Sequence, residues 1–115
     1  LAIAAARLGM QCWGIDIEED AVAAAHNNAT LNGVVLRADC TPLHAITGTF
    51  DLVVANLFAE VLVALSDDLK RVCSRRLVVA GVLSDRAESV IAALTPMKVD
   101  SREDEGDWCH LGFVW

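Results

Sequence analysis

The sequence is poor in basic residues, and this shortage limits the partners it can have. Lysine and arginine number 9 against 16 aspartate and glutamate residues, which gives a net charge of −7 at neutral pH. Proteins that bind duplex DNA or RNA usually carry a basic face. The one small basic cluster, Lys70-Arg71 with Arg75-Arg76, is typical of a helix C-terminus, where cations complement the helix dipole. The composition therefore argues against direct nucleic-acid binding and slightly favours a basic partner protein.

Long apolar runs and metal-type cysteine spacings are also absent. No apolar run reaches the roughly 18 residues that span a bilayer, and the alanine-rich start lacks the basic flank and cleavage site of a signal peptide. We therefore expect no membrane partner and a cytoplasmic location. The cysteines at positions 12, 40, 73 and 109 form no CxxC pair. We expect no metal site, and we interpret the cysteines as small buried hydrophobic residues.

The sequence also lacks an ordinary beginning. Residues 1–8 read as a helix already under way, with no initiator methionine, no capping Ser, Thr or Asp, and no strand before them. We expect that a chemically important segment belongs in front of Leu1. The 115 residues are 55% hydrophobic, which suits one domain with a sizeable core, so we predict a single domain over 1–115 that is incomplete at its N-terminus.

Strand-like apolar runs alternate with helical segments along the chain. We expect strands over 11–17, 34–39, 50–57 and 76–83, and helices over 19–32, 59–73 and 85–94, the last capped by Ser84. The residues that flank 105–107 predict a terminal antiparallel hairpin. Continuous hydrophobic strands separated by helices indicate a parallel sheet that is covered on both faces. The predicted fold class is α/β, a doubly wound, mostly parallel sheet with a C-terminal antiparallel hairpin.

Polar side chains stand where three of the predicted strands end, which is where open parallel sheets bind ligands. Asp16 lies at the end of the first strand, and its carboxylate could accept hydrogen bonds from both hydroxyls of a ribose. The alternative role for Asp16 is to cap the helix 19–32. Asp39 ends the second strand and could accept a hydrogen bond from an adenine amino group or, equally well, begin a turn.

Asn56 ends a strongly apolar strand, where an amide is costly unless it has partners. Its carbonyl could hold and orient a substrate amine or amide, and the alternative is an Asx turn into the helix 59–73. No Ser/His/Asp or Cys/His spacing supports nucleophilic catalysis. An NAD-dependent dehydrogenase stays open as an alternative, because Asp16 would serve there as well, but the terminal hairpin and Asn56 argue against it.

The chain resembles class I S-adenosylmethionine-dependent methyltransferases, and more narrowly the C-terminal catalytic domain of the ribosomal protein L11 methyltransferase family. The resemblance covers essentially all 115 residues. It rests on the following segments: LAIAAARLG, GIDIEEDAVAAAHNNATLNGV, FDLVVANLFAEVLVAL, LVVAGVLSDRAESVIAA and EGDWCHLGFVW. The resemblance implies a Rossmann-like fold, S-adenosylmethionine as cofactor, and methyl transfer to amino groups of a protein, in this case a ribosomal protein.

The resemblance also implies roles for individual residues. Asp16 would bind the ribose hydroxyls, Ile17 would flank the adenine, and Asp39 would lie beside the adenine amine. Asn56 would contact the cofactor near the transferred methyl group and act as the catalytic residue. Direct transfer of a methyl group to a neutral amine needs alignment and little covalent help from the enzyme.

The chain departs from the family pattern at its start. The usual first strand and the glycine-rich loop after it are not in the sequence, and Leu1 corresponds to the residue just after that loop. The family's separate substrate-recognition domain is not in the sequence either. A second alternative is therefore a non-catalytic interaction module derived from this fold, in which an oligomer could supply the strand.

Overall fold

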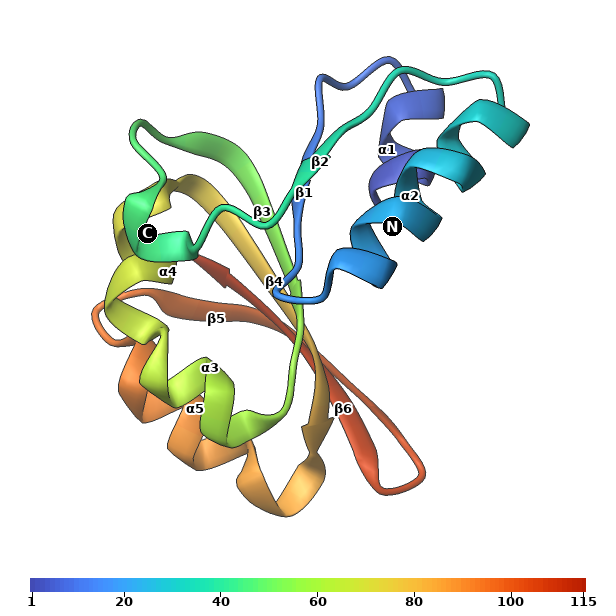
Figure 1. The fold of residues 1–115 in the computed structure, drawn as a ribbon. Coiled ribbons are helices and arrows are strands. Elements are labelled where there is room, and N and C mark those ends of the chain that lie inside the picture. Colours follow the sequence, from blue (N-terminus) through green and yellow to red (C-terminus); the bar gives the residue numbers. More distant parts are fainter. The chain divides into compact units, whose positions relative to one another are not determined.

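The computed structural model describes residues 1–115, which form two compact units, Leu1–Ile46 and Thr47–Trp115 (Figure 1). Both units combine helices with parallel strands, so the predicted α/β class is confirmed. The single domain over 1–115 stays a prediction. No helix in either unit is long and apolar enough to cross a membrane.

Unit 1 is a two-stranded parallel sheet with two helices. Its elements are α1 (Ala2–Arg7), β1 (Trp13–Ile15), α2 (Glu19–Leu31), β2 (Arg37–Asp39) and a 3-10 turn, η1 (Leu43–Ala45). Strands β1 and β2 are shorter than the predicted 11–17 and 34–39, because only three residues of each strand find a ladder partner. The small core is built around Ala29, Leu36 and Ala38.

Helix α2 follows the local signals for its two ends. Glu19 and Asp20 lie in its first turn, where negative charge complements the helix dipole. The helix ends at Leu31 with Asn32 as its C-cap, and Gly33 follows. These features confirm the predicted helix over 19–32 to within one residue.

Unit 2 is a four-stranded sheet with its helices on one side (Figure 1). Its elements are β3 (Phe50–Asn56), α3 (Ala59–Ala64), α4 (Ser66–Val72), β4 (Cys73–Leu83), η2 (Ser84–Arg86), α5 (Ala87–Leu94), β5 (Lys98–Glu105) and β6 (Trp108–Val114). The strand order is β3-β4-β6-β5. Strands β3 and β4 are parallel, whereas β6 is antiparallel to both β4 and β5. The predicted terminal hairpin is confirmed, and Gly106, with a φ of 59°, forms its turn.

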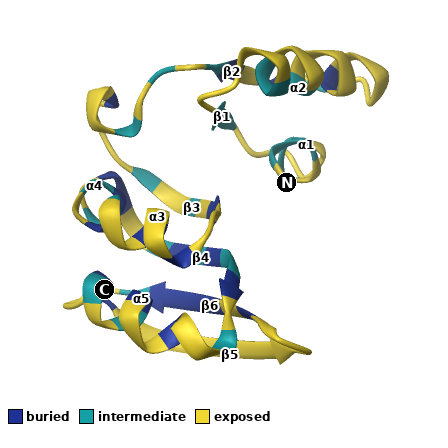
Figure 2. Cartoon of the chain, turned by 60° about the horizontal axis from the view of Figure 1, so that its bottom comes forward, coloured by how far each residue is buried: buried dark blue, intermediate teal, exposed yellow.

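The core of unit 2 lies between β4, β6 and the helices. Figure 2 shows buried residues concentrated on β4 and β6, while β5 is exposed along its length. Leu77, Val79, Leu111 and Phe113 are fully buried. Within this unit the helices cover one face of the sheet. Residues that alternate with the core positions of β4 are therefore only half-buried, as Val78 shows.

The helical segments differ from the prediction in two places. The helix expected over 59–73 divides into α3 and α4 at Leu65, and Cys73 already belongs to β4. Ser84 does not cap α5, which has Arg86 as its N-cap. The Ser84 hydroxyl instead donates a hydrogen bond to Oδ1 of Asp104, 2.8 Å away on β5. A partner brought close by the hairpin has therefore replaced the local capping bond.

The burial of the cysteines also corrects the sequence-based interpretation in part. Cys73 and Cys109 are buried, and desolvation raises the pKa of both thiols. Cys12 is half-buried and Cys40 is exposed. Cys40 lies outside the core because it follows the last paired residue of β2.

Lys70 and Arg71 of the basic cluster lie at a helix C-terminus as expected, whereas Arg75 and Arg76 belong to β4. Lys70 lies in the last turn of α4, and its ammonium donates hydrogen bonds to the carbonyls of Ala93 and Thr95, at 3.0 and 3.2 Å. These carbonyls lie at the end of α5, so Lys70 satisfies acceptors that the helix itself leaves unpaired. The Lys70 ammonium thus links the C-terminal ends of α4 and α5.

Replacement of Leu77 by alanine tests the position of this core. We expect L77A to lower the free energy of unfolding by about 2–5 kcal/mol, because it leaves a cavity at a fully buried site. Urea denaturation followed by circular dichroism measures the change. Leu83→Ala is the matched control, since Leu83 lies on the same strand but is 41% exposed. Equal losses for the two variants would contradict the assigned core.

Candidate functional site

Unit 1 brings Asp16, Ile17 and Asp39 to one edge of its sheet. Ile15 on β1 is paired with Asp39 on β2, and the backbone N–H of Asp16 donates a hydrogen bond to the carbonyl of Asp39 at 3.3 Å. Ile17 is 88% exposed, so an apolar side chain stands unpacked beside the two acids. Parallel pairing creates this arrangement, because it places the carboxyl ends of both strands together.

Only one oxygen of the Asp16 carboxylate accepts a hydrogen bond within the chain. Its Oδ1 accepts a hydrogen bond from the backbone N–H of Glu18 at 2.9 Å, which closes a turn ahead of α2. The N-cap of α2 is Glu18, so the expected alternative role of Asp16 as the cap residue was wrong. Oδ2 has no hydrogen-bond partner in the chain, and the side chain is exposed. Asp16 can therefore accept hydrogen bonds from a ligand.

The Asp39 carboxylate is far more occupied. Oδ1 accepts a hydrogen bond from the Thr41 backbone at 3.0 Å, and Oδ2 accepts bonds from Nε1 of Trp13 at 3.0 Å and Nε of Arg37 at 3.3 Å. The Arg37 guanidinium lies 3.5 Å from the centroid of the Trp13 ring. The bond from Thr41 confirms the turn-forming role of Asp39, while its contact with adenine stays a prediction.

These hydrogen bonds keep Asp39 ionised. Bonds from Thr41 are the largest cause of a pKa below the ordinary value for this carboxyl, and bonds from Trp13 and Arg37 lower the pKa further, while partial desolvation opposes them. The stability that Asp39 contributes is present at neutral pH. It is lost as the pH falls through this lowered pKa.

Asn56 lies in unit 2, at the carboxyl end of β3. Its side chain is exposed and makes no hydrogen bond within the chain, so the expected Asx turn into α3 was wrong. The ladder with β4 continues one step past it, because the Leu57 N–H donates to the Ala80 carbonyl at 3.1 Å. The backbone at Asn56 is therefore fixed by the ladder hydrogen bonds, while its side-chain carboxamide remains available to a ligand.

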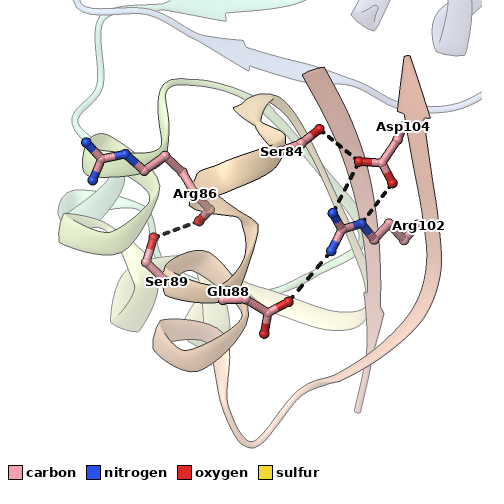
Figure 3. Close-up of polar contacts among 6 residues, drawn as sticks. All are labelled: Ser84, Arg86, Glu88, Ser89, Arg102 and Asp104. Atoms are coloured by element: carbon pink, nitrogen blue, oxygen red, sulfur yellow. Dashed lines mark hydrogen bonds and ion pairs between the residues drawn. The ribbon is translucent and has the colours of Figure 1, made fainter. Parts of the chain in front are cut away.

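A network of hydrogen bonds and ion pairs links η2, the segment that follows β4, to the β5–β6 hairpin (Figure 3). The Asp104 carboxylate accepts hydrogen bonds from Ser84 at 2.8 Å and from Nε of Arg102 at 2.9 Å. Arg102 and Ser84, in that order of strength, hold the pKa of Asp104 below its ordinary value. Glu88 lies 3.6 Å from Arg102 on the other side, and Ser89 donates to the Arg86 carbonyl at 2.7 Å. The network joins η2 and α5 to the hairpin.

A shallow hollow lies in each unit. In unit 2 a hollow of about 390 Å³ lies at the carboxyl end of β4, lined by Leu83, Ser84, Asp85, Gly106 and Asp107. The hollow of unit 1 lies at the amino ends of β1 and β2, opposite the edge that carries the candidate residues. No group of histidine, cysteine and acidic residues could hold a metal ion. No serine or cysteine is hydrogen-bonded to a histidine, so no activated nucleophile is present. The candidate residues Asp16, Asp39 and Asn56 are therefore suited to binding and orienting a ligand.

Comparison with known proteins decides the family. The family model described as ribosomal protein L11 methyltransferase (PrmA) matches residues 1–114. The chain belongs to this family. The ribosomal protein L11 methyltransferase of Geobacter sulfurreducens is 41% identical over 116 residues, which cover 96% of the chain and 39% of that protein. The chain therefore spans about two fifths of the length of this L11 methyltransferase.

Solved structures agree with this assignment. The crystal structure of a ribosomal protein L11 methylase from Lactobacillus delbrueckii subsp. bulgaricus matches with a TM-score of 0.92 at 30% identity, over 97% of the chain and 62% of that structure. An RNA methyltransferase from Salinibacter ruber, solved with S-adenosyl-L-homocysteine, matches with a TM-score of 0.76 at 21% identity, over 98% of the chain and 71% of that structure. This second likeness shows the fold alone.

Two features of this L11 methyltransferase family member escaped the sequence reasoning. The bond from Trp13 to Asp39 joins residues 26 positions apart, and no local pattern indicates it. Gly81 lies against Asn56, as described below. An isolated glycine inside an apolar strand is a known sign of a bulge or of close backbone approach, and it was the one available signal.

Replacement of Trp13 by phenylalanine tests the coupling to Asp39. We expect the pKa of Asp39 to rise, because W13F removes a donor to its charged form and keeps a ring face for Arg37. A carboxyl-carbon NMR titration measures the change. Trp108→Phe is the control, since Trp108 lies in unit 2 and makes no bond to Asp39. An Asp39 pKa that is the same in W13F and the parent protein would contradict the coupling.

Proposed function

We propose that the protein is an S-adenosylmethionine-dependent methyltransferase that modifies amino groups of a ribosomal protein. The observation that carries this proposal is the family match over residues 1–114. The relatives named above are L11 methyltransferases, so ribosomal protein L11 is the proposed substrate. Asp16, which directly follows β1, and Asn56, at the end of β3, carry the polar groups that this activity would use.

The residues of unit 1 suit the adenosine part of the cofactor. Asp16 has a free carboxylate oxygen, and a carboxylate offers two acceptors to the vicinal hydroxyls of a ribose. Ile17 is an exposed apolar side chain that can flank the adenine ring. Asp39 lies beside Asp16, and its ionised carboxylate is an acceptor for the adenine amine.

Asn56 is the proposed catalytic residue. S-adenosylmethionine supplies a methyl group on a positively charged sulfonium, and a neutral amine must approach it in line. The Asn56 carboxamide has a carbonyl oxygen that can accept a hydrogen bond from the substrate amine. This bond would orient the lone pair of the amine toward the methyl group. We also propose that Asn56 contacts the cofactor near the transferred methyl group.

The charge of the chain supports a protein partner. With a net charge of −7, long-range attraction favours a basic protein over nucleic acid or an anionic membrane surface. Because the proposed substrate is a ribosomal protein, we propose a cytoplasmic location.

Titration with S-adenosylhomocysteine tests the cofactor assignment. We expect the protein to bind this compound and not NAD, and we expect Asp16→Ala to weaken binding by about 10- to 100-fold, as for loss of hydrogen bonds to a charged group. Isothermal calorimetry measures both affinities. Asp20→Ala is the matched control, because Asp20 is an exposed acid in the first turn of α2.

Three outcomes would count against this assignment. Binding of NAD alone would favour the dehydrogenase alternative. Unchanged S-adenosylhomocysteine affinity in D16A would remove Asp16 from the ribose-binding role. Binding of neither compound by a folded protein would favour the non-catalytic interaction module.

Transfer of tritiated methyl groups to ribosomal protein L11 tests the reaction. We expect Asn56→Ala to lower kcat about 10- to 100-fold, because an amine that is no longer oriented reaches the in-line geometry less often. Asn27→Ala is the control, since Asn27 is an exposed asparagine on α2. A kcat that is equal in the N56A and N27A variants would exclude Asn56 as the catalytic residue.

A further inference from the structure

Gly81 on β4 lies directly against the Asn56 side chain. A Cβ atom at Gly81 would be 2.8 Å from Oδ1 of Asn56 and 3.1 Å from the backbone oxygen of Leu57. Contacts under 3.0 Å essentially never occur for real Cβ atoms. The carboxamide of Asn56 therefore occupies space that any other amino acid at position 81 would fill.

The backbone at Gly81 has a special conformation as well. Its φ of 79° is one that side-chain-bearing residues rarely adopt. The pairing of β4 with β6 shifts register between Val79 and Val82, so Gly81 lies in an irregular step of the strand. Because Asn56 is paired with Ala80, this step falls directly beyond the partner of Asn56.

The chain on both sides of Gly81 is anchored. Before it, Ala80 accepts the ladder bond from Leu57 at 3.1 Å. After it, the Ser84 N–H donates to the Asp107 carbonyl at 2.8 Å, and the Ser84 hydroxyl donates to Asp104 (Figure 3). Strand β4 thus has little freedom to move away from an added Cβ. The Asn56 carboxamide has no hydrogen bond in the chain, so it is the group that would move.

We propose that Gly81 is a positioning residue for Asn56. The bare Cα of Gly81 leaves the space in which the Asn56 carboxamide lies against β4, and this contact sets the direction in which the carboxamide meets the substrate amine. The inference rests on the proposed function, which assigns the amine to Asn56.

Comparison of Gly81→Ala with Gly106→Ala tests this role. Both glycines have a positive φ, so alanine strains the backbone at either site, but at Gly106 a Cβ would meet nothing within 4 Å. We expect G81A to lower kcat for methyl transfer about tenfold, with the KM for the protein substrate changed less than kcat, as for loss of orientation. We expect G106A to leave kcat unchanged. Equal kcat values in G81A and the parent protein would overturn the proposal.

A double-mutant cycle separates action through Asn56 from general damage. In an Asn56→Ala background the contact no longer exists, so G81A should cause no further loss of kcat. G81A should also lower the urea midpoint of unfolding less in this background than in the parent protein. Losses of kcat that multiply independently would overturn the proposal, as would an equal stability cost in both backgrounds.

The side-chain amide resonances of Asn56 give a readout that needs no catalysis. In protein free of cofactor and substrate, G81A should shift the Asn56 side-chain N–H signals in a proton–nitrogen NMR spectrum, and G106A should not. Unshifted signals would overturn the positioning role even if the parent enzyme is active. Shifted signals in a protein that transfers no methyl group would support the contact and refute the proposed function.

Discussion

The parallel pairing of β3 with β4 is the interaction on which unit 2 depends. Strand β4 joins the parallel and antiparallel parts of the sheet, and its residues Leu77, Val79 and Val82 are fully buried. Burial of such side chains is the main favourable term in folding. The same register that buries them places Asn56 opposite Ala80. The packing of the core and the placing of the candidate catalytic side chain are therefore consequences of one set of backbone hydrogen bonds.

Unit 1 follows the same rule on a smaller scale, and the two units differ in how free their polar groups are. Three paired residues on each strand suffice to bring Asp16 beside Asp39. Asp39 is bound by Thr41, Trp13 and Arg37, Asp16 has one partner, and Asn56 in unit 2 has none. A group whose hydrogen-bonding capacity is already met within the chain has less to offer a ligand. Asp16 and Asn56 are thus better suited to bind than Asp39.

The chemistry that the candidate residues of each unit can perform follows from their functional groups. Carboxylate and carboxamide oxygens accept hydrogen bonds and orient partners, and neither unit holds a nucleophile activated by a histidine. Methyl transfer to an amine asks for this kind of help, because alignment of the two reactants accounts for much of the barrier that an enzyme can remove. In the proposed positioning role of Gly81, the hydrogen bond from Ser84 to Asp104 holds the end of β4 and so limits movement of Gly81.

The sequence by itself determined the α/β class, the order of helices and strands, the terminal hairpin, and the position of Asp16, Asp39 and Asn56 at strand ends. These follow from hydrophobic periodicity and turn residues, which act within a few positions of the chain. Only the tertiary structure decided how long each strand is, that the helix over 59–73 breaks at Leu65, and that Ser84 bonds to the hairpin. It also decided how far each polar side chain is occupied and that Gly81 meets Asn56. These features depend on partners distant in the sequence, which are brought together only when the strands pair.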